Sequence, residues 1–183
     1  MSLFAPVPFE WAFRACALKF GVPWSMMAGM AANASGFDPG ATGPTRDHGL
    51  MQVIESNAPG CGITVAELSE PGPNICCAAS LLKKHFARIR PYAKSRKDLW
   101  RIVMLANNLG WGNVRGFLEG RPTPVTWEEM KLRSSGYPSK HRWVERMFET
   151  SERYHSEERM TLFTLGFAVT AGLGAAIAIW RAK

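Results

Sequence analysis

The sequence has few of the patterns that mark common enzyme and binding classes. Its four cysteines include no Cys-x-x-Cys pair, and its four histidines are scattered, so the spacing of a zinc site is missing. It contains neither a Gly-x-Ser-x-Gly turn nor a glycine-rich phosphate loop. Nucleic-acid-binding motifs are missing too. We therefore expect no metal, no cofactor and no nucleic-acid partner.

Alternation of apolar and polar residues with a period of two, which indicates strands, is also missing. We therefore expect a mainly α fold with at most one small hairpin. Gly21 is placed to end a first helix, and Thr126 and Glu129 have the spacing of a capping box. Apolar periodicity predicts helices over residues 9–20, 23–34, 76–88, 95–109 and 139–159. Residues 36–45 are rich in glycine and proline, which predicts a loop.

The state of the cysteines is open from sequence. Cys76 and Cys77 are neighbours in an apolar run, which favours buried thiols over disulfides. A disulfide that involves Cys61 is an alternative, and the pattern does not say whether Cys61 or Cys16 has a partner.

One hydrophobic run stands out near the C-terminus. Residues 161–180 contain no charged side chain, and a helix of about 20 apolar residues crosses the roughly 30 Å core of a bilayer. We expect a membrane-spanning tail, with a buried helix of the folded domain as the alternative. The expected organisation is a helical domain over residues 1–150, a linker or helix extension over 151–160, and a transmembrane helix over 161–180. Small residues spaced four apart in the tail are compatible with a homo-oligomer.

Charge suggests how such a tail would be oriented. Arg181 and Lys183 follow the run, which favours a cytoplasmic C-terminus and a folded domain on the opposite side of the membrane. Residues 1–8 lack the basic start of a secretory signal, so we expect delivery by another route. The net charge of +7 suits an anionic partner such as peptidoglycan, nucleic acid or lipid, although a solvated basic surface explains it as well.

Several short segments in a fixed order carry a family resemblance. The segments are Ala34-Ser-Gly-Phe-Asp-Pro39, Gly49-Leu-Met-Gln-Val53, Pro73-Asn-Ile75, Ala106-Asn-Asn-Leu-Gly-Trp-Gly-Asn-Val114 and Gly136-Tyr-Pro138. Together they resemble the lytic transglycosylase (SLT domain) and goose-type lysozyme superfamily. The resemblance implies a lysozyme-like helical fold with a cleft for peptidoglycan glycan strands. It also implies that the folded domain faces the cell wall.

The first segment departs from the family at one position. The family normally has Glu-Ser-Gly there, whereas this chain has Ala34. In the family this glutamate is thought to protonate the bond between N-acetylmuramic acid and N-acetylglucosamine, and then to take the proton of the muramic 6-hydroxyl as a 1,6-anhydro ring closes. Alanine can perform neither transfer, so we expect the chain as written to be inactive.

The resemblance also implies substrate-binding residues. These are Ser35, Met51, Gln52, Asn108 and Tyr137. Asn107 stands where the family usually has tyrosine, and a helix cap is an alternative role for Asn108. Asp47 and Glu55 flank the second segment and are possible secondary carboxylates, or else a loop cap and a solvated carboxylate.

Two functions follow from these residues. The first is a membrane-anchored lytic transglycosylase, associated with a phage or a secretion apparatus, whose catalytic acid has been replaced at Ala34. The alternative is a naturally inactive module that binds peptidoglycan and tethers a membrane or particle to the cell wall. A further reading makes the domain an unrelated helical adaptor on a membrane tail.

Overall fold

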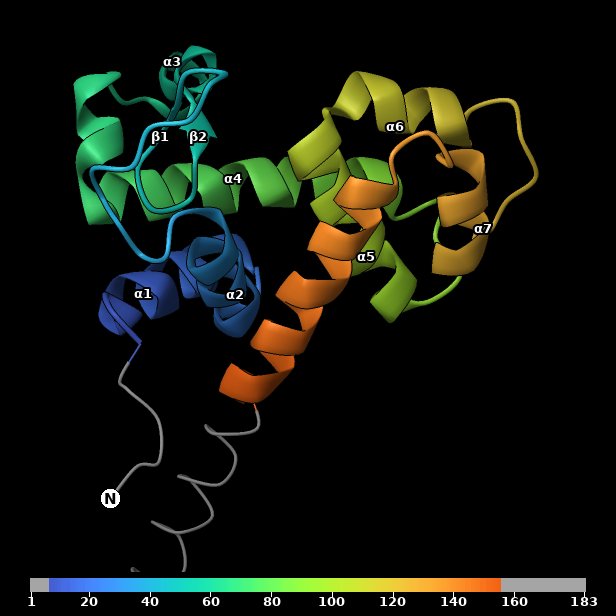
Figure 1. The fold of residues 1–183 in the computed structure, drawn as a ribbon, viewed down its shortest axis with the longest axis horizontal. Helices are drawn as coiled ribbons and strands as arrows, with labels where there is room; N and C mark the ends of the chain where they lie inside the picture. The colour runs from blue at the N-terminus through green and yellow to red at the C-terminus, as the bar shows by residue number, and fades with distance from the viewer. Residues whose placement is uncertain (1–6, 156–183) are drawn as a thin grey trace, which may run out of the picture.

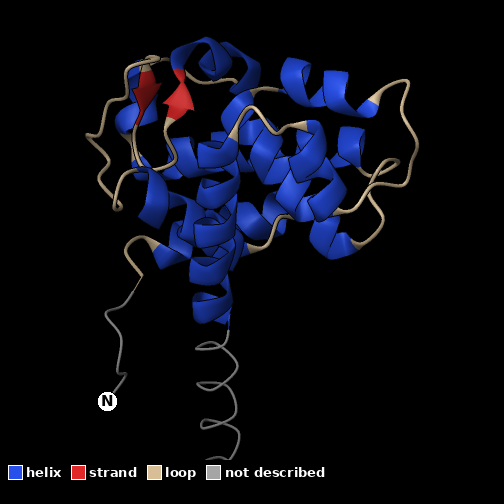
Figure 2. Ribbon diagram, turned by 45° about the vertical axis from the view of Figure 1, so that its right-hand side comes forward, coloured by secondary structure: helices blue, strands red, loops and turns tan. Residues whose placement is uncertain are grey.

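Helices dominate the chain, and the expected mainly α fold is confirmed. The computed structural model describes residues 7–155, in which one short antiparallel hairpin accompanies the helices (Figure 2). The elements are α1 (Glu10–Phe20), α2 (Trp24–Ala34), β1 (Asp47–His48), β2 (Val53–Ile54), η1 (Glu55–Asn57), α3 (Ala58–Cys61), η2 (Ala66–Ser69), α4 (Pro71–Ile89), α5 (Arg96–Leu109), α6 (Trp111–Leu118), α7 (Trp127–Arg133) and a last helix over residues 138–155.

The two N-terminal helices agree closely with the sequence expectation. α1 ends at Gly21, whose positive φ of 69° terminates the helix, and α2 follows from the N-cap Pro23. α1 packs against both α2 and α4. The buried side chains of α2 include Met27 and Met30, which belong to the main hydrophobic core.

α4 is the long central helix, and it separates two groups of elements (Figure 1). The hairpin and α3 lie at one end of α4, whereas α6 and α7 lie beyond its other end. α4 begins at Pro71, five residues before the expected start. A proline in the first helical turn removes no hydrogen bond, so the Pro-Gly-Pro sequence that suggests a loop is compatible with a helix start.

All four cysteines form disulfides, so the expectation of buried thiols is wrong. Cys16 of α1 is bonded to Cys76, and Cys61 of α3 is bonded to Cys77. Consecutive residues on a helix point about 100° apart, so these two neighbours on α4 reach different elements. The partners lie 60 and 16 residues away in sequence, and only the tertiary fold brings them together.

The second half of the domain contains two helices with side-chain caps, α5 and α7. Ser95 caps α5 by accepting from the backbone N–H of Asp98, and Asp98 in turn accepts from the N–H of Trp127 at the start of α7. The predicted capping box between Thr126 and Glu129 is confirmed. α6 was not expected as a separate helix, and it starts directly after Gly110.

The last helix returns to α2 and packs closely against it. A Cβ atom on Gly29 would lie 2.9 Å from the carbonyl oxygen of Met147 and 3.1 Å from the backbone nitrogen of Ser151. The helix continues across the expected border at residue 150, and Ser151 is buried. Within residues 7–155, no helix is long and apolar enough to cross a membrane. The tail over residues 161–180 lies outside the described residues.

Candidate active site

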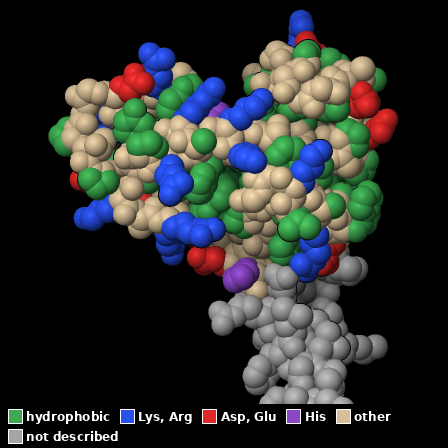
Figure 3. Space-filling view, turned by 180° about the vertical axis from the view of Figure 1, so that it is seen from behind, with side chains coloured by type: hydrophobic (Ala, Val, Ile, Leu, Met, Phe, Trp, Pro, Cys, Tyr) green, Lys and Arg blue, Asp and Glu red, His purple; other side chains and the backbone are tan. Residues whose placement is uncertain are grey.

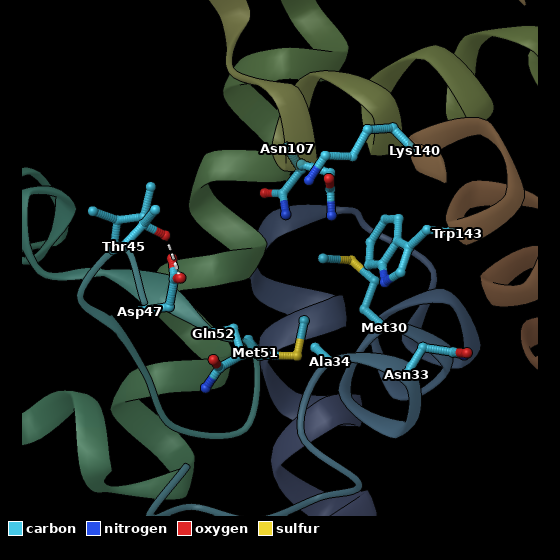
Figure 4. A pocket seen from close by; sticks show the side chains of 12 residues that line it. Met30, Asn33, Ala34, Thr45, Asp47, Met51, Gln52, Asn107, Lys140 and Trp143 are labelled. Carbon is cyan, nitrogen blue, oxygen red and sulfur yellow. Dashed lines mark hydrogen bonds between the residues drawn. The ribbon is translucent and has the colours of Figure 1, made fainter. Parts of the chain in front are cut away.

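A pocket of about 270 Å³ opens between α2, the hairpin, the end of α5 and the start of the last helix (Figure 4). It contains most of the residues that the sequence marked as a site. Its lining residues are Met30, Asn33, Ala34, Thr45, Asp47, Met51, Gln52, Ile54, Asn107, Asn108, Lys140 and Trp143.

Ala34 lies on the wall of this pocket. It is the last residue of α2, and its half-buried methyl group shares one face of the helix with Met30, four residues earlier. The adjacent Asn33 also lines the pocket. The hydroxyl of Ser35 donates to the carbonyl oxygen of Leu50 at 2.8 Å, which fixes the end of α2 against the Gly49–Gln52 turn. Ser35 is thus a structural contact at the edge of the site and is not among the pocket's lining residues.

The turn between β1 and β2 is held by a buried asparagine. Asn74 is fully buried in α4 and accepts from the N–H of Met51 at 2.8 Å. Its amide group donates to the carbonyl oxygens of His48 and Leu68, at 2.8 and 2.9 Å. Gly49 has a φ of 71°, and a Cβ atom there would lie 2.2 Å from the Leu68 carbonyl oxygen. These contacts hold the turn in a fixed position against α4 and η2.

Gln52 has an unusual backbone for a residue that is not glycine. Its φ is 49°, in the left-handed region, and conformations of this kind gather at functional sites. Its amide nitrogen donates to the carbonyl oxygens of Gly49 and Ala41, at 2.9 and 3.1 Å. These bonds orient the side chain at the base of the pocket, beside the buried Met51 (Figure 4).

Two neighbouring asparagines at the end of α5 line the opposite side. Asn107 and Asn108 both border the pocket. The buried carboxamide oxygen of Asn108 has no hydrogen-bond partner among the described residues. An unpaired polar atom at a pocket is available to a polar ligand, and an amide suits the hydroxyl and acetamido groups of a sugar.

The two secondary carboxylates differ in position. Asp47 lines the pocket, accepts from the hydroxyl of Thr45, and stands across from α2 (Figure 4). Glu55 is not among the lining residues and binds Arg46 at 2.7 Å. The hydrogen bond from Arg46 holds the pKa of Glu55 below its ordinary value, so this carboxyl group has no proton to donate at neutral pH.

Tyr137 lies apart from the pocket lining. It precedes the last helix and contacts Phe117 of α6, with 6.2 Å between ring centroids. The structure instead brings Lys140 and Trp143 into the site, from the first turns of that helix. Sequence analysis missed these two residues, since they lie about 100 residues from Ala34 and carry no motif of their own.

A second pocket continues from the first. It has a volume of about 600 Å³ and shares Thr45, Ile54, Asn107 and Asn108 with the pocket beside Ala34. Its other lining residues are Ser56, Asn57, Leu81, Lys84, His85, Arg88, Ala106, Leu109, Gly110 and Trp111. The two form one groove, which we call the Ala34 groove. Figure 3 shows the molecule hollowed between two lobes, with Lys and Arg side chains around the hollow.

The described residues offer no metal site, since no three His, Cys, Asp or Glu side chains lie close enough to hold an ion. The geometry is thus a groove with polar amides, one carboxylate and a methyl group on its walls.

The profile of the family described as "Transglycosylase SLT domain" matches residues 12–128. The chain belongs to this family. The resemblance drawn from the motifs is confirmed.

Curated relatives of this SLT domain include two proteins named membrane-bound lytic murein transglycosylase F. The protein from Serratia proteamaculans is 27% identical over 130 residues, which cover 66% of this chain and 26% of the relative. The protein from Alcanivorax borkumensis is 28% identical over 129 residues, which cover 68% of this chain and 27% of the relative. The chain thus spans about a quarter of the length of these relatives.

Solved structures show the same fold. An inactive mutant of the lytic transglycosylase Slt from Pseudomonas aeruginosa superposes with a TM-score of 0.70 at 18% identity, over 84% of this chain and 25% of that one. The 70 kDa soluble lytic transglycosylase from Escherichia coli gives a TM-score of 0.69 at 19% identity, over 82% of this chain and 24% of that one. The lysozyme-like transglycosylase fold expected from the motifs is therefore confirmed.

Proposed function

We propose that this SLT domain binds peptidoglycan glycan strands in the Ala34 groove and, with alanine at that position, holds them without cleaving them. The observation that supports this most is the position of Ala34 on the wall of a groove that still carries polar amide groups. The motif resemblance implies that this position corresponds to the family's catalytic glutamate.

Binding of the glycan and cleavage of its glycosidic bond require different chemical groups. Cleavage of the bond between N-acetylmuramic acid and N-acetylglucosamine requires a proton on the leaving oxygen. A methyl group cannot supply it. Hydrogen bonds to sugar hydroxyl and acetamido groups do not depend on that proton, and the amides of Gln52, Asn107 and Asn108 remain at the groove. The chain as written would then act as a glycan-binding module with the architecture of a lytic transglycosylase.

Asp47 supports a second candidate, a chain that is active without the glutamate. It is the one carboxylate among the described lining residues of the pocket beside Ala34. If Asp47 acts as the acid, the chain releases muropeptides from purified sacculi and Asp47→Asn abolishes the release. Absence of product from the unaltered chain excludes this candidate.

We also propose that residues 161–180 anchor the domain in a membrane. The last helix contributes Lys140 and Trp143 to the groove and then runs away from it (Figure 1). At 1.5 Å per residue, the helix rises about 18 Å between Trp143 and His155. The end of the described chain and its N-terminal end lie on the same side of the molecule, opposite the hairpin. An anchor that follows would hold the groove away from the bilayer, towards the wall.

The disulfides support a location on the wall side. The Cys16–Cys76 and Cys61–Cys77 disulfides require an oxidising compartment. The cytosol of most bacteria is reducing. A wall-binding domain on one anchor suits a virus particle or a secretion apparatus that crosses the wall locally. Fractionation of producing cells tests this location, because the protein should be found with membranes or virions and not as a free cytosolic species.

Sedimentation with purified sacculi tests the binding proposal. The full chain in detergent should sediment with sacculi and release no soluble muropeptide. Ala34→Trp fills the pocket and should abolish co-sedimentation, whereas Leu132→Trp adds the same side chain at a position that is 76% exposed and should bind normally. Equal binding by both variants would place the glycan elsewhere and contradict the proposal.

A further inference from the structure

The groove changes character along its length. The pocket beside Ala34 contains amides, Asp47 and Lys140, whereas the larger pocket next to it contains two cations on α4. Lys84 and Arg88 are four residues apart and therefore lie on one face of that helix. Among the described residues that line the larger pocket there is no Asp or Glu.

Both cations are held at the pocket without a carboxylate partner in the lining. The Lys84 ammonium group is 3.4 Å from the carbonyl oxygen of Gly60. The Arg88 guanidinium lies over the ring of Trp111, 5.6 Å from its centroid. A carbonyl and an aromatic face orient a cation but leave its full charge uncompensated. The pocket therefore favours an anion.

The imidazole between these cations adds a second, independent feature. The Nδ1 atom of His85 is buried and has no hydrogen-bond partner among the described residues. Ser56 and Asn57 of η1 supply hydroxyl and amide groups to the same pocket. The pocket thus offers positive charge, hydroxyl and amide groups, and one buried ring nitrogen without a hydrogen-bond partner, which suits a charged peptide.

We propose that this compartment, defined by Lys84, His85, Arg88 and Trp111, binds the free carboxylates of the peptide stems that peptidoglycan strands carry. The inference rests on the proposed function, because it requires the glycan to occupy the pocket beside Ala34. A stem attached to a sugar there would extend into the adjoining volume of about 600 Å³, since the two pockets share four lining residues. The domain would then prefer strands with peptide stems to bare glycan.

Calorimetric titration of the full chain in detergent tests this preference with two ligands. One is a glycan oligomer without peptides, and the other is the same oligomer with stems that end in free carboxylates. We expect the peptide-bearing ligand to bind at least about tenfold more tightly, as two charge-assisted contacts would provide. Lys84→Gln combined with Arg88→Gln should remove this advantage, so that the variant binds the two ligands with equal affinity.

The matched control is Lys83→Gln combined with Arg90→Gln. These residues are exposed cations of the same helix and its C-cap that are not among the lining residues, and the change in net charge is identical. The control should retain the preference. Loss of the preference in the control would mean that long-range charge produces it, which would overturn the assignment.

Other outcomes separate this inference from the proposed function. Equal binding of the two ligands by the unaltered chain would overturn the inference and leave glycan binding intact. Binding of neither ligand would overturn both. Equally tight binding of a single-stranded oligonucleotide, weakened by the same double substitution, would make the compartment a general polyanion site and would also overturn the inference.

Discussion

The side-chain oxygen of Asn74 accepts a hydrogen bond of 2.8 Å from the backbone N–H of Met51, and through it α4 positions the turn that forms the base of the groove. Asn74 is fully buried, and its amide group also satisfies two backbone carbonyls. A single side chain therefore forms hydrogen bonds with three backbone polar groups in and around the turn.

Asn74→Ala should lower the free energy of unfolding by about 2–4 kcal/mol, because several buried polar groups lose their partners at once. Chemical denaturation measures this change. Asn113→Ala is the control, since Asn113 is exposed and its side chain donates locally, to the carbonyl oxygen of Leu109 at the end of α5. If the two substitutions were equally mild, the turn would not depend on Asn74.

Gly49→Ala should destabilise the domain by about 2–4 kcal/mol and weaken glycan binding. The new Cβ atom would overlap the Leu68 carbonyl oxygen and would require a left-handed backbone. Gly116→Ala in α6 is the matched control: nothing lies within 4 Å of its Cβ position, so the change should be neutral or slightly stabilising. Thermal unfolding and sacculus binding measure the two effects. A tolerant Gly49→Ala variant would mean that the turn moves freely.

Each disulfide should stabilise the domain by about 3–4 kcal/mol in the chain-entropy account, given sequence separations of 60 and 16 residues. Cys61→Ser combined with Cys77→Ser, and separately Cys16→Ser combined with Cys76→Ser, should each lower the melting temperature. Thiol titration of the unfolded, unreduced protein should find no free thiol. Reactive thiols in protein from an oxidising compartment would contradict the pairing.

His85 should make stability depend on pH. Burial, followed by the charges of Arg88 and Lys84, lowers the pKa of His85 to about 4. The unfolded chain takes up a proton at this residue below about pH 6.5, while the folded protein does not until about pH 4. The contribution of neutral His85 to the free energy of unfolding is therefore complete above about pH 6.5, and it is lost as the pH falls from about 6.5 to about 4.

The loss reaches at most about 3.5 kcal/mol, since a pKa difference of one corresponds to about 1.4 kcal/mol. Denaturant titrations between pH 4 and 7 should show a steeper decline for the unaltered chain than for His85→Gln, which cannot take up the proton. His155→Gln, at an exposed histidine, should keep the original slope. Parallel curves for the unaltered chain and His85→Gln would refute the assignment of this titration.

Local signals predicted much of the fold, and long-range contacts account for what they missed. Gly21, Ser95 and the Thr126–Glu129 box act through neighbouring residues, so helix ends could be read directly. The disulfides, by contrast, depend on which elements α4 meets. α6 was missed because Gly112 and Gly116 weaken the helical pattern of its short sequence.

The site likewise combines residues that motifs predicted with residues that only tertiary packing brings in. Ala34, Met51, Gln52 and Asn108 were found through motifs and meet at one pocket. Trp143 and Lys140 enter it only because the last helix packs on α2, where Gly29 allows close approach. Glu55 was a candidate through its position near the motif, but a salt bridge to Arg46 occupies it outside the pocket. Sequence spacing does not distinguish a carboxylate in the groove from one beside it.

Mass spectrometry of the material that Ala34→Glu releases from purified sacculi tests the central claim most directly. A carboxyl group at the end of α2 should restore cleavage and yield soluble muropeptides with 1,6-anhydro ends. Ala34→Gln, which has nearly the same shape but cannot donate an acid proton, and the unaltered chain should yield none. A folded, sacculus-bound Ala34→Glu protein that releases no such product would contradict the account.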